Sequence, residues 1–125
     1  MTIRPFSALT SAFKKIAKSL WEDNMHESWQ TYDGSDMFVV ENDGRIVCGF
    51  AVYRDTSDGI SGLFCSGWAG RHEKVPCGRI LQLLASSVGD VYLKTDKRTA
   101  KILLEKIGKR VKTTDRFGYY IIKGK

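Results

Sequence analysis

Residues 37–53 read MFVVENDGRIVCGFAVY, and this stretch decides the fold class of the chain. Residues 37–41 and 45–53 are rich in β-branched and aromatic side chains, which favour extended backbone. Between them, Asn42-Asp43-Gly44 supplies the small polar residues that a tight turn needs. The stretch therefore predicts a β-hairpin, and a third strand is predicted at 60–68, after a second turn signal.

Helical and strand-like segments alternate on both sides of this hairpin. A strand is predicted at 2–5 and a helix at 9–21, where apolar residues recur at helical spacing. After residue 68 come a loop at 69–77, a helix at 78–88, a strand at 90–94, a helix at 97–107 and a hairpin of 110–114 with 117–122. A strand–helix–strand connection places 90–94 parallel to 60–68. The order predicts an α/β fold with a mixed central sheet flanked by helices.

Length and composition fit one globular domain over residues 1–125. The chain has 125 residues, of which 42% are hydrophobic and 11% aromatic, enough for one packed core. No run of about 18 apolar residues occurs, so no membrane span is predicted. Lysines interrupt the N-terminal segment, which argues against a secretory leader, and the expected location is cytoplasmic. An odd number of cysteines, at Cys48, Cys65 and Cys77, favours reduced thiols.

The positive charge is concentrated near the C-terminus. Of the net +6, residues 94–125 carry 11 basic and 3 acidic side chains, which gives +8, whereas residues 1–93 sum to −2. Such a region fits an acidic partner, either a nucleic acid or an acidic protein surface, or is simply a solvated face. The side chains that we expect to meet such a partner are Lys97, Arg98, Lys101 and Lys109.

Three segments resemble the GNAT (Gcn5-related N-acetyltransferase) superfamily. The hairpin FVVENDGRIVCGFAVYRD is similar to that family's central strand pair, and CGRILQLLASSV to the helix after its pyrophosphate loop. TAKILLEKIGKR is similar to its late helix, and together the three cover roughly residues 37–123. The resemblance implies a GNAT-like single domain and a site for acetyl-CoA. It also implies that strands 60–68 and 90–94 splay apart to admit the pantetheine arm.

The resemblance assigns cofactor contacts to residues around the third strand and the helix after it. In the family, backbone N–H groups of a glycine-rich loop hold the pyrophosphate at a helix start. Gly78 takes the first glycine position, whereas Val75 and Ile80 replace the polar opener and the second small residue, and we expect Ile80 to crowd the phosphate. The positions implied for cofactor binding are Phe64, Cys65, Arg71, Lys74, Gly78 and Arg79. Cofactor loss and retained acetyl-CoA binding both stay open.

The catalytic positions of the family are altered. Its enzymes often use a tyrosine on the late helix as general acid, and that position is Leu104, which has no proton to give. Lys97 replaces a common asparagine, and the candidate bases are His72, Glu73 and Asp90. No catalytic residue is therefore predicted. The sequence also lacks a zinc-ligand spacing, a nucleophile elbow, a Walker loop and an HExxH motif, so no metal site is predicted.

The termini carry a narrower resemblance. The start MTIRP and the close FGYYIIKGK are similar to those of small acetyltransferase-like proteins of short-tailed phages, which are associated with internal virion proteins and virion morphogenesis. That resemblance implies a virion or host protein as partner, and a location in the virion or the host cytoplasm. Three hypotheses follow: a non-enzymatic GNAT-like binding protein, an active acetyl-CoA-dependent N-acetyltransferase, and a nucleic-acid binder that uses residues 94–125.

Overall fold

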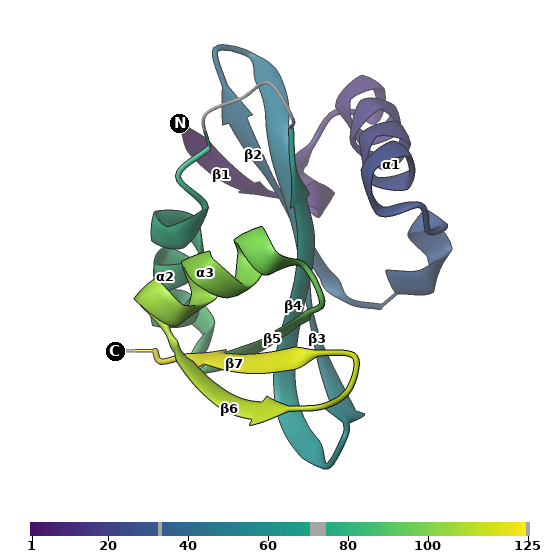
Figure 1. Cartoon of the computed structure of the whole chain (residues 1–125). Helices are drawn as coiled ribbons and strands as arrows, with labels where there is room; N and C mark the ends of the chain where they lie inside the picture. The colour runs from purple at the N-terminus through teal and green to yellow at the C-terminus, as the bar shows by residue number, and fades with distance from the viewer. Residues whose placement is uncertain (33, 71–74, 125) are drawn as a thin grey trace. The chain divides into compact units, whose positions relative to one another are not determined.

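The computed structural model describes residues 1–32, 34–70 and 75–124 (Figure 1). The short turns η1 (Phe6–Ala8) and η2 (Trp29–Tyr32) flank the first helix. The remaining elements, in chain order, are β1 (Thr2–Pro5), α1 (Ser11–Met25), β2 (Asp36–Asn42), β3 (Arg45–Ser57), β4 (Ile60–Ala69), α2 (Cys77–Val88), β5 (Val91–Thr95), α3 (Arg98–Ile107), β6 (Lys109–Thr113) and β7 (Gly118–Ile122). Each predicted helix and strand is present, with ends that differ by a few residues.

The strands form one mixed sheet in the order β1-β2-β3-β4-β5-β7-β6. The pairings β1–β2, β2–β3, β5–β7 and β6–β7 are antiparallel, whereas β4–β5 is parallel, as the sequence predicted for 60–68 and 90–94. The residues group into two compact units, Met1–Tyr53 with Ser66–Val75 (the first unit) and Arg54–Cys65 with Pro76–Lys125 (the second unit). Both β3 and β4 run through both units, so each unit holds its own part of the sheet.

The hairpin that decides the fold turns at Asp43 and Gly44. Both residues have left-handed backbone, with φ of 52° and 77°, which matches the right-handed twist of the two strands that they join. The pairing sets Phe38 opposite Phe50, with ring centroids 5.2 Å apart. The predicted turn residues therefore do what their chemistry indicated.

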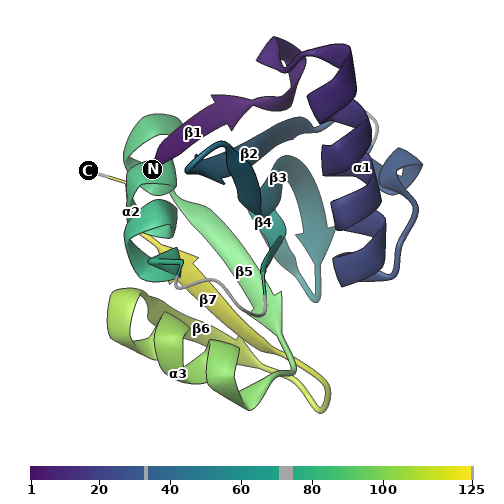
Figure 2. The same cartoon turned by 90° about the horizontal axis from the view of Figure 1, so that it is seen from above.

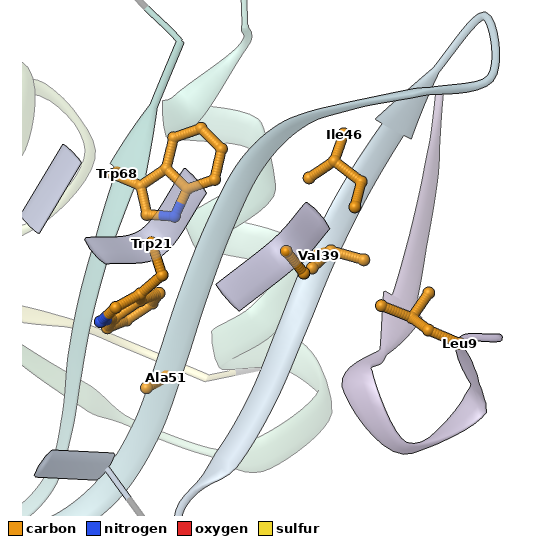
Figure 3. Packing of buried hydrophobic residues seen from close by; sticks show 7 residues of the cluster. Leu9, Trp21, Val39, Ile46, Ala51 and Trp68 are labelled. Atoms are coloured by element: carbon orange, nitrogen blue, oxygen red, sulfur yellow. The ribbon is translucent and has the colours of Figure 1, made fainter. Parts of the chain in front are cut away.

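The core of the first unit is built around two tryptophans (Figure 3). Thr10 caps the start of helix α1, because its hydroxyl accepts a hydrogen bond from the Phe13 N–H. The helix contributes Trp21, which is 1% exposed, to this core. From β4, Trp68 lies against Gly49, where a Cβ would come within 2.7 Å of the indole nitrogen. Only glycine leaves the room that this ring needs.

The core of the second unit lies between its two helices and its strands. Helices α2 and α3 lie on the same side of β5 and β7 in both views of the chain, as Figure 2 shows from above. The cluster that fills this layer consists of Ala85, Val91, Leu104, Tyr120 and Ile122. No charged side chain is buried among the residues that the structure describes. None of the described helices is long and apolar enough to cross a membrane.

Candidate functional site

The described residues assigned to the cofactor all belong to the second unit. Phe64 and Cys65 lie next to each other on β4 and both are buried. The Phe64 ring packs on Tyr92, with centroids 5.5 Å apart, and edge-on to Tyr119 at 6.5 Å. Both side chains are thus part of the core, so any contact with a cofactor at these positions would come from their backbone.

Strands β4 and β5 are joined over a short length. Within the described ranges, the parallel ladder between them registers at one pair, Phe64 opposite Tyr92. By contrast, β5 and β7 register over five pairs, from Val91 opposite Ile122 to Thr95 opposite Gly118. The brief ladder is consistent with the splay that the sequence resemblance implied.

Helix α2 begins with three backbone donors that lack a partner within the helix. Pro76 is the N-cap and has no N–H, and the Ile80 N–H is already bonded to the Pro76 carbonyl at 3.1 Å. The orphan donors of this helix start are therefore the N–H groups of Cys77, Gly78 and Arg79. No acidic residue lies in the first turn of α2, so that turn itself places no carboxylate at the positive end of the helix dipole.

Ile80 and Gly78 have packing roles that the sequence did not reveal. Ile80 is 2% exposed, so its side chain faces the protein interior, and the crowding of a phosphate that we expected from it is not what the structure shows. A Cβ on Gly78 would lie 3.1 Å from Ile107 and 3.5 Å from Leu103. The glycine thus lets α2 approach α3 closely, which explains its presence without a bound cofactor.

Charge around this helix start comes from Arg79, which is exposed. The other predicted cations, Arg71 and Lys74, lie outside the described residues, as do the candidate bases His72 and Glu73. Cys77, the first residue of the helix, is a half-buried thiol whose pKa is raised by burial. A reactive thiolate at this end of α2 is therefore not favoured at neutral pH.

The position that aligns with the family's general acid is buried. Leu104 is 3% exposed and packs with the aliphatic and aromatic side chains of the second core. Two tyrosines lie on β7, but each is already engaged: the Tyr120 hydroxyl donates to Glu105 at 3.4 Å, and the Tyr119 hydroxyl donates to the Asp58 carboxylate and lies 2.7 Å from the Ser57 hydroxyl. Burial raises the pKa of both phenols. Neither is a substitute for the missing proton donor.

Asp90, the one candidate base that the structure describes, holds the end of the chain. Its carboxylate accepts a hydrogen bond from the Gly124 N–H at 2.8 Å and pairs with the Lys123 ammonium at 3.0 Å. These two partners, the N–H first, hold the pKa of Asp90 below its usual range. A carboxylate with a lowered pKa is a weak base, so this arrangement serves structure better than proton abstraction.

The structure divides the predicted basic residues between two places. Lys97, Arg98 and Lys101 lie at the start of α3, and Lys97 is its N-cap without a side-chain hydrogen bond to the helix. Lys109 begins β6 and instead lines a groove of about 620 Å³ next to α2. Two further cations of that groove, Lys106 and Lys123, were not predicted from the sequence. Apolar periodicity does not show that the ends of α3 and β7 lie next to α2.

Comparisons with known proteins identify the fold. No protein-family profile matches the chain, and no curated protein sequence matches it significantly. Among solved structures, a ribosomal-protein-alanine N-acetyltransferase from Brucella melitensis is similar at a TM-score of 0.65 and 13% identity, covering 98% of this chain and 99% of that one. The N-acetyltransferase PseH from Campylobacter jejuni, in complex with acetyl coenzyme A, is similar at 0.66 and 14% identity, covering 99% of each chain.

A third similar structure is yncA, a putative acetyltransferase from Salmonella typhimurium with its cofactor acetyl-CoA. It matches at a TM-score of 0.62 and 12% identity, covering 98% of this chain and 92% of that one. The predicted fold class is confirmed by these likenesses: the chain has the GNAT fold, a mixed α/β sheet with helices. Because a fold hosts many functions, the activity has to be argued from the residues.

Proposed function

We propose that this chain is a GNAT-fold binding protein without acetyl-transfer activity of its own. The observation that carries the proposal is Leu104, which aligns with the family's general-acid position and is buried in the core of the second unit. A leaving thiolate needs a proton, and loss of general-acid help alone costs about 10²–10⁴ in rate. Water could supply that proton in an open site, but a buried leucine leaves it no room at this position.

Two other arrangements support the same proposal. Asp90 is engaged with Gly124 and Lys123, so it is not available as a base. Gly78, the glycine that aligns with the phosphate loop, is used to bring α2 against Ile107. Residues that align with catalytic or cofactor-binding positions of the family therefore have structural roles in this chain.

The test is an assay for acetyl-CoA hydrolysis and for acetyl transfer to a panel of amines and peptides. A GNAT enzyme of known activity serves as the positive control, and heat-denatured chain as the blank. We expect the unaltered chain to give no turnover above the blank. Turnover that scales with the concentration of the chain would contradict the proposal.

A second candidate is an active, acetyl-CoA-dependent N-acetyltransferase with an atypical site. Two observations favour it: the N–H groups of Gly78 and Arg79 at the start of α2, which have no partner within the helix, and the single registered pair between β4 and β5. Those donors fit a pyrophosphate, and the Arg79 guanidinium would add positive charge beside it. When bound, acetyl-CoA supplies an activated acetyl group.

A calorimetric and thermal-shift titration with acetyl-CoA and CoA separates the two candidates. A ligand at about 100 times its dissociation constant stabilises the folded state by roughly 2.7 kcal/mol, which raises the unfolding midpoint by about 10 °C for a chain of this length. Binding without turnover supports a protein that kept the cofactor site and lost the chemistry. Binding with turnover supports the second candidate.

The partner that we propose is a protein, in line with the resemblance of the termini to phage proteins of virion assembly. Detection of the chain in purified virus particles by mass spectrometry would support that role, and its absence from them would count against it. Nucleic acid is the alternative partner, through Lys97, Arg98, Lys101 and Lys109. Binding to DNA or RNA would then weaken steeply between about 50 and 200 mM salt, because phosphate contacts release counterions.

A further inference from the structure

We infer that the groove between α2 and the end of α3 is a docking site for an acidic segment of a partner protein that carries an aliphatic side chain. The inference deepens the proposed function, since it names the surface by which this binding protein would hold its partner. It rests on three features of the second unit: the charge of the groove wall, its apolar floor and an exposed leucine.

The wall of the groove is cationic on every segment that forms it. Arg79 comes from α2, Lys106 from α3, Lys109 from β6, and Lys123 from the residues after β7. None of the described residues that line the groove is acidic. Of the four cations, Lys123 pairs with Asp90, whereas Arg79, Lys106 and Lys109 form no salt bridge with any other described residue. Four like charges around one hollow repel one another, so carboxylates placed there would relieve that repulsion.

The floor of the groove is apolar. It is formed by Ile107, Ile121 and Ile122, and the groove volume of about 620 Å³ is enough for several side chains. Leu83 lines the groove from α2 and is 46% exposed, which is unusual for a large aliphatic side chain. An aliphatic anchor beside Leu83, flanked by Asp or Glu, would match both halves of the surface.

These features favour an acidic peptide over a nucleic acid. No aromatic side chain is among the described residues that line the groove, so there is no platform on which a base could stack. Phosphates would use the lysines but would leave Leu83 and the isoleucine floor uncovered. An acidic and aliphatic segment uses both.

The probe is a display library of random 12-residue peptides, selected on the immobilised chain. We expect the enriched peptides to combine Asp or Glu with Leu or Ile, and we would measure the best of them by fluorescence anisotropy at about 100 mM salt. Lys106→Glu with Lys109→Glu should weaken binding at least tenfold, and Leu83→Ala about threefold or more. Each altered side chain is exposed, so circular dichroism should show an unchanged fold.

Matched controls separate the groove from charge and apolarity in general. Lys97→Glu with Arg98→Glu makes the same change in net charge outside the groove, and Ile102→Ala trims a side chain that is 47% exposed, close to the value for Leu83. We expect both controls to bind within twofold of the unaltered chain.

Several results would overturn the inference. They are selection of peptides without acidic residues, no enrichment at all, an equal effect of the two charge-reversed pairs, or displacement of the peptide by acetyl-CoA. If a single-stranded DNA 20-mer bound more strongly than the peptide, and if Leu83→Ala left that binding unchanged, the surface would be assigned to nucleic acid instead. The acetyl-transfer assay is independent of these outcomes, so turnover would refute the proposed function while leaving the groove result intact.

Discussion

Replacing Leu104 with tyrosine restores the side chain that the family uses as general acid, and we expect it to destabilise the chain rather than activate it. The site is 3% exposed and is surrounded by Ala85, Val91, Tyr120 and Ile122. Extra volume in a packed core costs about 1–3 kcal/mol, and a buried hydroxyl without a partner costs about 1–3 kcal/mol more. The expected loss is therefore about 2–6 kcal/mol of unfolding free energy, out of a total of about 5–15 kcal/mol for a typical domain.

Urea unfolding followed by far-ultraviolet circular dichroism measures this loss. For a chain of this length, each 1 kcal/mol lowers the thermal midpoint by about 4 °C, so the midpoint should fall by about 8 °C or more. Ile102→Tyr, on the exposed side of the same helix, is the matched control and should stay within about 0.5 kcal/mol of the unaltered chain. If Leu104→Tyr were as stable as that control, position 104 would face open space, and the argument from its burial would fail.

Three further outcomes are expected. Burial, and then the hydrogen bond to Asp58, raise the pKa of Tyr119 above its ordinary value of 10.0. The neutral phenol therefore stabilises the folded state below pH 10, and this contribution is lost as the pH rises further. Tyr119→Phe should reduce the fall of the urea midpoint between pH 9 and about 11. The lowered pKa of Asp90 means that its carboxylate stabilises the folded state above pH 3.8, and that this contribution is lost as the pH falls further. Asp90→Asn should therefore reduce the difference in urea midpoint between pH 7 and about 3. All three tryptophans lie in the first unit, so indole fluorescence reports that unit; a fluorescence transition that coincides with circular dichroism would support the predicted single domain over residues 1–125, and separated transitions would contradict it.

Local chemistry was enough to predict the fold. The turn at Asp43 and Gly44, the cap at Thr10 and the alternation of helical and strand-like segments are each encoded within a few neighbouring residues. Their order then restricted the topology, because a strand–helix–strand crossover runs parallel. The ends of the elements were less well predicted: α1 continues to Met25, beyond the expected 21, and Met25 packs against the core of the first unit, a tertiary contact that the periodicity does not encode.

The candidate site was predicted in part, and the reason is tertiary. The alignment of Leu104, Gly78 and Arg79 with positions of the family followed from the sequence alone. It could not show that Leu83 is 46% exposed, or that cations from four segments line the same groove, because these facts depend on where α2 lies against the end of α3. Apolar periodicity marks a helix but does not say which edge of its apolar face a neighbouring helix leaves uncovered.

The motif residues of this chain are better explained by packing than by chemistry. A glycine at position 78 is what a phosphate loop needs, and it is equally what a close contact with Ile107 needs. An aliphatic residue at position 104 removes a general acid, and it also fills the layer between α3 and the sheet. Selection for the fold alone would keep both residues, whereas selection for acetyl transfer would keep the glycine and restore a protic side chain at 104. The pair that is present therefore fits the proposal that this chain is a binding protein without acetyl-transfer activity of its own.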